Sequence, residues 1–501
     1  MKFTLGLLLG LGLVLPGHAQ QPLSADPQIK DPARFDSNRP LARDLETHVP
    51  DGFTVAVGGD LLIDRSVGAM LARDAGFAKV AEVIQHADLG VANMEQAIVD
   101  TPRFSGSIML DPEEVILAAA PPAAALDLAT LGLRLLARAN NHALDWGIAG
   151  MEETSRNLDA AGIAYAGVGE NLGLARRAGY LEARRARVGL VSIASTFGPL
   201  ANALDGADGA PARPGLSPLH LKATTILPSP VYDRMRAVRD ELYPTAKGQT
   251  PLAMFGTTFE RGERFALEYA MDSQDAAAFL RAVRGGKQAC DLLIAAIHSH
   301  EPGNSAVPTP TTDQYDIPAA FIGQLAHAAI DAGADLWVTT GIHHVGGIEI
   351  YHGRPIFYGM GDLFWVAGGA EPPQPTDATR NFAPQLAAAF RHPERATDHD
   401  LAEVSDEGFF ANPLPFESFV AQVRFAGNRF AEARLYPVDL GYLRRWTERG
   451  VPRPASPATA RAILERVARQ SQRFGTRLEI QPDADFGFVG VIGGNPEPSG
   501  R

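Results

Sequence analysis

The sequence predicts a layered α/β fold, and two observations lead to this prediction. From Phe53 onward, short apolar runs that end in polar residues alternate with segments of helical periodicity, as expected for strands that alternate with helices. Hydrophobic residues make up 46% of the chain and charged residues 21%, so it can bury a large core and is neither disordered nor a coiled coil. At about 100–200 residues per domain, 501 residues correspond to about two to four domains or to one large α/β unit with insertions.

The apolar runs provide the strands of this fold. They are Phe53–Val57, Leu89–Ala92, Leu131–Ala137, Val188–Ile193, Leu292–Ile297 and Leu336–Thr339. Between them, Gly147–Ala161 and Phe321–Ala332 have helical periodicity, and the second is followed by Gly333, a residue type that commonly ends helices. Strands and helices in this order predict sheets covered by helices.

The remaining segments are assigned by composition. Residues 1–19 are predicted as a signal peptide, 20–50 as an extended leader, 51–365 as the main domain with an irregular insertion at about 196–272, 366–415 as an irregular loop, 416–476 as a C-terminal hairpin and helix that complete the domain, and 477–501 as a tail. The hairpin is expected from Phe419–Phe425 and Phe430–Val438 with Gly427-Asn428 in the turn, and the helix from Ala458–Phe474. This segment is rich in Pro and Gly, and because a structureless loop of its length is unusual in a compact domain, it is expected to be a long insertion or a lid.

The first residues have the pattern of a secretory signal peptide. Lys2 precedes the apolar run Phe3–Leu15, and small residues occupy the positions before a cut after Ala19. The run is shorter than the ~20 residues that span a bilayer, and no later stretch is apolar enough to do so. We therefore expect an exported, periplasmic or extracellular protein whose mature chain has no transmembrane segment.

Charge and cysteine content exclude several classes of protein. The net charge of −13 argues against a general binder of nucleic acid or of anionic membranes. An anionic substrate would need a local basic surface, for which Arg234, Arg236 and Arg239 are candidates, although a solvated helix face explains them better. The single cysteine, Cys290, precedes an apolar run and excludes both an intrachain disulfide and a cysteine-based metal cluster.

Polar side chains follow five of the predicted strands. They are Asp60 after the first, Glu95 after the second, Asn140-Asn141-His142 and then Asp145 after the third, His298 and His300 after the fifth, and His343 and His344 after the sixth. In open α/β sheets, ligands bind outside the carboxyl ends of the strands, so these loops are expected to converge. A mixture of carboxylate, amide and imidazole favours Zn, Mn or Fe over Mg or Ca.

Each of these residues alone also has a structural explanation. Asp60 could cap a helix, Asn140-Asn141 could form a turn, and His298 and His300 could lie on opposite faces of a strand end. Five such coincidences at strand ends favour a shared divalent-metal centre of one or two ions.

These segments also resemble a known family. The matching motifs are Gly59-Asp60, Asn93-Met94-Glu95, Ala139–Gly147, Ala166–Gly169, His298–Glu301, Arg213–Leu216 and Gly333–Asp362. From about Phe53 to Thr476 the chain is similar to the CapA family of capsule or poly-γ-glutamate synthesis proteins, within the calcineurin-like metallophosphoesterase superfamily. The resemblance implies a four-layer α/β/β/α sandwich with a metal site at the sheet edges.

The resemblance also implies roles for individual residues. Asp60, Asn141, His298 and His343 would be metal ligands, Glu95 a bridging carboxylate, and His142 a proton donor or a stabiliser of developing charge; His300 and His344 are further ligand candidates. Asp145 would fix the tautomer of His142, or would instead cap the following helix. The superfamily has a histidine where this chain has Leu62, which leaves open whether one or two ions bind.

Two functions are consistent with these features. The first is an exported metal-dependent hydrolase of capsule or poly-γ-glutamate synthesis or export, acting on a phosphoester or a γ-glutamyl amide. Its expected partners are an anionic polymer or phosphoester substrate and membrane capsule-synthesis machinery. The alternative is a non-catalytic, polymer-binding accessory protein with a degenerate metal site.

Overall fold

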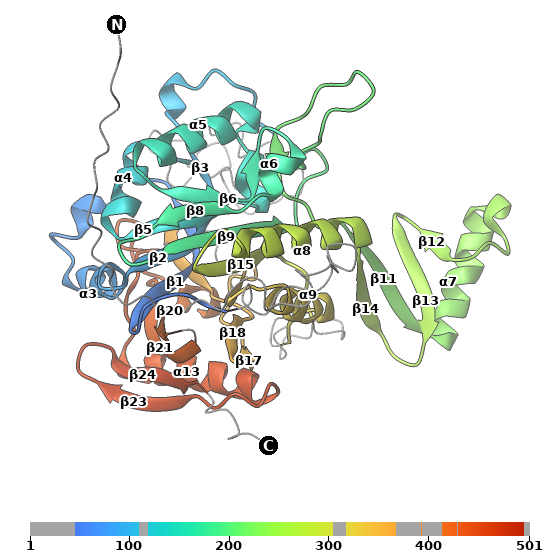
Figure 1. The fold of residues 1–501 in the computed structure, drawn as a ribbon. Coiled ribbons are helices and arrows are strands. Elements are labelled where there is room, and N and C mark those ends of the chain that lie inside the picture. The colour runs from blue at the N-terminus through green and yellow to red at the C-terminus, as the bar shows by residue number, and fades with distance from the viewer. Residues whose placement is uncertain are drawn as a thin grey trace, which may run out of the picture. The chain divides into compact units, whose positions relative to one another are not determined.

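Two sheets form the framework of the computed structural model, which describes residues 46–109, 119–303, 317–366, 392, 413–427 and 429–494 (Figure 1). The first sheet contains β1 (Phe53–Ile63), β2 (Leu89–Met94), β5 (Leu133–Ala137), β6 (Ala164–Ala166), β19 (Asp362–Val366), β20 (Glu417–Ala426), β21 (Arg429–Asp439), β22 (Arg453–Pro454), β23 (Glu479–Asp483) and β24 (Gly487–Gly493). The second contains β8 (Gly179–Glu182), β9 (Arg187–Ala194), β15 (Leu292–His298), β16 (Leu336–Thr340), β17 (Ile348–Tyr351) and β18 (Arg354–Phe357). The predicted signal peptide, most of the leader and most of the 366–415 loop lie outside the described residues.

The strand order places parallel strands at the middle of each sheet. The first sheet has the order β23-β24-β21-β20-β1-β2-β5-β6, with β19 paired to β1 and β22 to β21. Strands β1, β2, β5, β6 and β19 are parallel, whereas β20, β21, β24 and β23 extend the sheet in antiparallel fashion. The second sheet has the order β17-β18-β16-β15-β9-β8, and its central strands β18, β16, β15 and β9 are parallel. Parallel strands bring their carboxyl ends to one edge, where the candidate site lies.

Helices cover the outer faces of both sheets. Those on the first sheet are α3 (Ala75–Gln85), α4 (Ala123–Thr130) and α5 (Gly147–Ala160), and those on the second are α8 (Ser273–Lys287) and α9 (Ala320–Asp331). Side chains of β1 alternate accordingly: Val55 and Val57 pack in the core between the sheets, and Ala56 packs in the core under the helices. The inner core joins Val57 to Ile294 and Val338 of the second sheet. The layers are therefore helix, sheet, sheet and helix, as the resemblance implies.

The C-terminal hairpin and helix occur as expected, with an addition. β20 and β21 pair in antiparallel fashion with Gly427 in the turn, and Asn428 lies outside the described residues. Helix α13 (Pro457–Gln472) buries Ile463 and Val467 in the inner core rather than on an outer face. Residues 479–493, which by composition belong to a tail, form β23 and β24 and extend the first sheet. The glycines of β24 weaken the strand pattern in the sequence.

The insertion has more regular structure than its Pro and Gly content predicts. It contains β10 (Gly215–Leu216), β11 (Leu221–Pro228), α7 (Ser229–Leu242), β12 (Leu252–Met254), β13 (Thr257–Gly262) and β14 (Ala266–Met271). The last four strands form a sheet of order β12-β13-β11-β14, and β10 pairs with the short β7 (Val168–Gly169). Many residues of β11 and β13 are partly exposed, so these strands lack the apolar runs by which buried strands are recognised.

Further short elements connect these layers. They are β3 (Ala97–Ile98), which pairs with β4 (Ala119–Ala120), helix α6 (Leu172–Arg176), and the 3₁₀ helices η3 (Gly68–Met70), η4 (Thr101–Arg103), η5 (Asn141–Leu144), η6 (Pro244–Ala246) and η8 (Leu414–Phe416). Among the described residues, no helix is both long enough and apolar enough to cross a bilayer.

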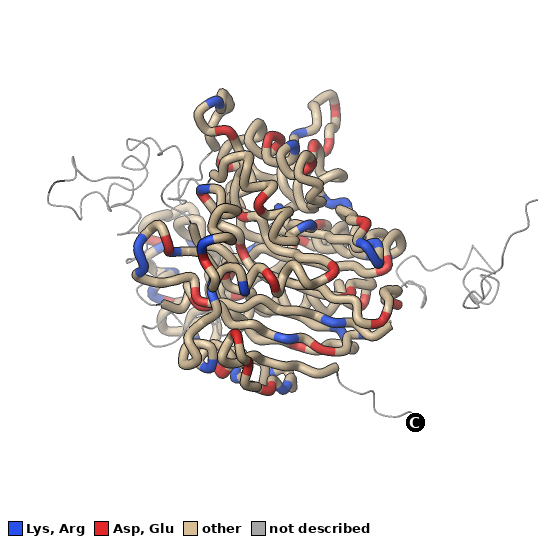
Figure 2. The backbone as a smooth tube through the Cα atoms, turned by 90° about the vertical axis from the view of Figure 1, so that its left-hand side faces the viewer, with Lys and Arg blue, Asp and Glu red and all other residues tan. Residues whose placement is uncertain are grey.

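Charges of both signs are interspersed along the backbone in the view of Figure 2. Two of the arginines proposed for a basic surface form ion pairs with aspartates of the insertion. The guanidinium of Arg239 is buried and lies 2.6 Å from Asp240, and that of Arg236 lies 3.0 Å from Asp233. These two arginines therefore contribute little to a surface for a polyanion.

Candidate metal centre

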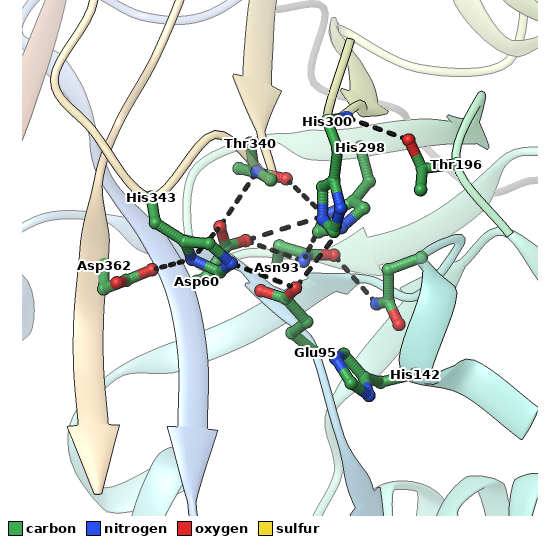
Figure 3. A network of polar contacts seen from close by, with 12 residues as sticks. Asp60, Asn93, Glu95, His142, Thr196, His298, His300, Thr340, His343 and Asp362 are labelled. Atoms are coloured by element: carbon green, nitrogen blue, oxygen red, sulfur yellow. Dashed lines mark hydrogen bonds and ion pairs between the residues drawn. The ribbon is translucent and has the colours of Figure 1, made fainter. Parts of the chain in front are cut away.

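The predicted site residues meet where parallel strands of the two sheets end (Figure 3). Asp60 lies in β1, and Glu95 directly follows β2. His298 is the last residue of β15, and His343 follows β16 after a short turn. The side chains of all four point toward one another, so residues far apart in the sequence share one centre.

Asp60 is fully buried and is held by two hydrogen bonds. Its Oδ1 accepts from the side-chain amide of Asn93 at 2.7 Å, and its Oδ2 accepts from the N–H of Gly341 at 2.9 Å. Gly341 has a φ of +99°, and a Cβ there would lie 2.8 Å from the carbonyl oxygen of Ser299, so this turn requires glycine. Burial, together with the nearby carboxylate of Asp362, raises the pKa of Asp60 to about 6. A bound cation would relieve this unfavourable charge.

Asp362 is a buried carboxylate of the centre that the strand-end pattern does not predict. It begins β19 and pairs in register with Asp60. Its Oδ1 lies 2.8 Å from Nδ1 of His343, and its Oδ2 has no hydrogen-bond partner among the residues that the structure describes. Asp362 stands at the start of an apolar run rather than at its end, which is why it was not among the predicted site residues; its only signal was its place in a family motif.

His343 adopts a backbone conformation that is unusual for a residue with a side chain. Its φ is +51°, in the left-handed region. Its ring packs edge-on against Trp365 at a centroid distance of 5.1 Å. Burial alone would lower the pKa of His343, but the carboxylates of Asp362 and Asp60 outweigh this effect and raise the pKa. Local strain of this kind often marks a residue that is placed for function.

His298 and His300 form the opposite side of the centre. Their Nε2 atoms are 3.1 Å apart, and Nε2 of His298 lies 3.3 Å from Oε1 of Glu95. Nδ1 of His298 lies 3.2 Å from both the Asn93 amide and the Thr340 hydroxyl. Burial, followed by the other imidazoles, lowers the pKa of His298 well below its usual value and that of His300 to about 3. Both rings are therefore neutral, as metal ligands must be.

The centre contains two overlapping groups of potential ligands. Glu95, His298 and His300 form one group, and Asp60, Glu95, His343 and Asp362 form the other; within each, the ligand atoms lie within 4.8 Å of one another. Glu95 belongs to both groups. Carboxylate and imidazole donors match divalent Mn, Zn or Fe, and Oδ2 of buried Asp362, which has no hydrogen-bond partner in the described part of the chain, is the kind of atom that a cation satisfies. The residues present therefore fit a divalent metal ion.

His142 and Asp145 form a pair beside these groups. Nδ1 of His142 lies 2.7 Å from Oδ2 of Asp145, and both side chains are buried. The residue at the N-cap position of α5 is Trp146, so Asp145 holds the imidazole rather than occupying that cap. His142 is among the groups that lower the pKa of His298 and of His300, so its ring lies within electrostatic reach of these two histidines. The two side chains are therefore in contact, and the catalytic roles of His142 and Asp145 stay predictions.

The third loop contributes through Asn140 as well as through its predicted residues. The side-chain amide of Asn140 donates to Oδ1 of Asn93 at 3.2 Å and to the carbonyl oxygen of Met94 at 2.8 Å. These two hydrogen bonds hold the third loop against the end of β2. Asn141 is buried at the start of η5, and its role as a ligand stays a prediction. His344 turns Nδ1 to the carbonyl oxygen of Ile342 at 2.7 Å, and neither ligand group among the described residues includes it.

Leu62 occupies an apolar environment. It packs with Trp365, Phe416 and Leu440 in a small cluster next to the centre. Leu62 stands where the resemblance implies a histidine, and its cluster includes the Trp365 ring that also contacts His343.

Known proteins and one family are similar to this chain in sequence. The family described as bacterial capsule synthesis protein PGA_cap matches residues 54–365. Uncharacterized protein y4sH of Sinorhizobium fredii is 37% identical over 463 residues, which cover 90% of this chain and 96% of that protein. Probable polyglutamine synthesis accessory protein Rv0574c of Mycobacterium tuberculosis is 27% identical over 357 residues, which cover 63% of this chain and 74% of that protein.

Among solved structures, a hypothetical protein from Thermus thermophilus aligns with a TM-score of 0.35 at 11% identity, covering 77% of this chain and 99% of that chain. This similarity is too low to support a conclusion. The family match spans more than half of the sequence and includes the segments that carry Asp60, Glu95, His298 and His343. The chain therefore belongs to the PGA_cap family of bacterial capsule synthesis proteins.

Proposed function

We propose that this chain is an exported metal-dependent hydrolase that acts on a phosphoester or γ-glutamyl amide during synthesis or export of an anionic capsule polymer. One observation carries the proposal: the buried His142–Asp145 pair lies near the ligand groups, since His142 is among the groups that lower the pKa of His298 and of His300. A metal site next to an oriented acid–base residue is the arrangement that hydrolysis requires.

The ligand groups would hold the metal through the side chains already described. Asp60, Glu95, His343 and Asp362 would form one position, and Glu95 with His298 and His300 the other. A bound divalent ion supplies Lewis acidity and lowers the pKa of a coordinated water from ~15.7 toward ~7. Asp60, Glu95, His298 and Asp362 are buried, which strengthens their electrostatic effect on a substrate.

His142 is the residue placed to move a proton. Asp145 lies 2.7 Å from its Nδ1 and fixes the orientation of the ring. The carboxylate of Asp145 stabilises the protonated ring, so His142 can donate a proton to the leaving oxygen or nitrogen. General acid–base residues of this kind typically contribute about 10²–10⁴-fold to the rate.

Export is supported by the N-terminal pattern of a charged residue, an apolar run and small residues before Ala19. An anionic polymer or its phosphorylated precursor, handled beside membrane capsule-synthesis machinery, is the substrate class that fits the family.

The alternative is an accessory protein without catalysis. Leu62 in an apolar cluster favours it, because one potential ligand position is lost. The name of the Mycobacterium relative, a polyglutamine synthesis accessory protein, is also consistent with it.

Metal analysis combined with an activity assay distinguishes the two functions. The purified chain is loaded with Mn²⁺ or Zn²⁺ and assayed with bis(p-nitrophenyl) phosphate and with a γ-glutamyl p-nitroanilide. We expect His142→Ala to keep its metal and to lose at least about 100-fold in turnover. His352→Ala, which alters an exposed histidine outside the centre, serves as the matched control and should remain active. Bound metal without turnover in the unaltered chain would favour the accessory role.

A further inference from the structure

We infer that the centre has two positions of different metal preference, because Asp362 makes one of them oxygen-rich. The position formed by Asp60, Asp362, Glu95 and His343 would take a hard ion such as Mn²⁺, and the position formed by Glu95, His298 and His300 would take Zn²⁺. The inference rests on the metal-binding part of the proposed function and is independent of whether the chain hydrolyses anything.

The backbone is built to bring Asp362 next to Asp60. β19 runs parallel to β1 with these two residues in register, and the N–H of Asp60 donates to the carbonyl oxygen of Gly361 at 3.2 Å. A Cβ on Gly59 would lie 1.6 Å from that same carbonyl oxygen, so a larger residue at position 59 would separate the strands. This close approach thus depends on glycine at position 59.

The approach places two carboxylates together where water does not reach them. Asp60 and Asp362 are both fully buried, and burying like charges is costly unless a cation or hydrogen bonds compensate. Asp60 receives two hydrogen bonds, whereas the Oδ2 of Asp362 has no hydrogen-bond partner within the described part of the chain. A buried carboxylate oxygen without a hydrogen-bond donor is a ligand that a hard cation would use, and Oδ2 of Asp362 is such an oxygen.

The other position has a different chemistry. Two imidazoles supply its nitrogen donors, with Nε2 of His298 lying 3.1 Å from Nε2 of His300 and 3.3 Å from Glu95. Imidazole favours Zn²⁺ and related ions, whereas a set of three carboxylates and one imidazole favours Mn²⁺ relative to Zn²⁺. Zn²⁺ generally binds more tightly than Mn²⁺ at any one site, so the expected difference lies in the ratio of the two affinities.

The test separates the two positions by loading them in sequence. The metal-depleted full chain receives one equivalent of Zn²⁺, and Mn²⁺ is then titrated while electron paramagnetic resonance measures the free ion. We expect one Mn²⁺ to bind in addition to the Zn²⁺. Asp362→Asn should weaken Mn²⁺ binding at least about tenfold and leave the first Zn²⁺ unchanged, and His300→Asn should do the reverse.

Asp145→Asn is the matched control, because it removes a buried carboxylate that contacts His142 and belongs to neither ligand group. It should keep both metals. Retention of normal Mn²⁺ binding by Asp362→Asn, or equal weakening of both metals by either ligand variant, would overturn the inference. Because Zn²⁺ bound by Asp362→Asn also demonstrates a folded centre, loss of Mn²⁺ alone cannot be attributed to unfolding. Selective binding without turnover would leave the inference intact and refute only the hydrolase.

Discussion

The two sheets contribute different chemistry to one centre. The first sheet, with the residue that follows β2, supplies the carboxylates of Asp60, Glu95 and Asp362, and the second, with the turns that follow its strands, supplies imidazoles. The pKa shifts differ accordingly: burial and a like charge raise the pKa of Asp60, and burial lowers the pKa of His298. A bound cation would relieve the repulsion among the carboxylates of the first sheet. Because both ligand groups combine residues of the two sheets, the centre is complete only when the sheets are packed together.

Glu95 is the residue that joins the two sides, and its replacement should have the largest effect. Glu95→Gln removes an anionic ligand from both groups, so we expect loss of both metals and at least about a 10³-fold loss of turnover. Metal content by mass spectrometry and the phosphodiester assay check this. Glu82→Gln, on the exposed surface of α3, is the control and should behave as the unaltered chain. One full equivalent of metal left in Glu95→Gln would mean that the two positions do not share this carboxylate.

Removal of the metal should lower the stability of the folded chain, because the ligands of the centre come from both sheets. A ligand at 100 times its dissociation constant stabilises the folded state by about 2.7 kcal/mol, so chelation should lower the melting temperature by a few degrees. Differential scanning calorimetry with EDTA, then with added Mn²⁺ or Zn²⁺, measures this. An unchanged Tm after verified metal removal would show that the sheets hold the centre without its ion.

A substitution at Gly59 tests whether the Asp60–Asp362 pair depends on the close approach of the β1 and β19 backbones. Gly59→Ala forces a Cβ against the Gly361 carbonyl, and we expect about 1–3 kcal/mol of destabilisation together with weaker Mn²⁺ binding. Gly285→Ala is the control, because this glycine lies in α8 with open space around its Cβ position and should gain up to about 1 kcal/mol. Urea unfolding of both variants gives the comparison. Equal stability of the two would mean that β1 and β19 can separate at no cost.

The sequence predicted the residues that stand at the ends of buried strands. Glu95 and His298 each follow an apolar run, so the strand period and the direction of parallel strands were enough to bring them together. Asp362 precedes its run, and only the register of β19 against β1 places it in the centre. The position of α13 in the inner core was also beyond prediction, because an amphipathic pattern does not specify which sheet face the helix covers.

The smallest expected effect on stability concerns two residues with a left-handed backbone conformation. One lies in the centre and the other lies in the insertion. His343 has φ +51° and Phe255, in the exposed turn between β12 and β13, has φ +53°. Asparagine tolerates this conformation better than either, so Phe255→Asn should stabilise the fold by about 0.5–1 kcal/mol. His343→Asn relieves a similar backbone strain, but it also removes the imidazole that lies 2.8 Å from Oδ1 of buried Asp362, so the metal-free protein should lose stability and its metal affinity should fall. If His343→Asn stabilised the metal-free chain and also bound metal normally, the strain at His343 would have no connection with the ion; calorimetry of both variants, with and without metal, decides this.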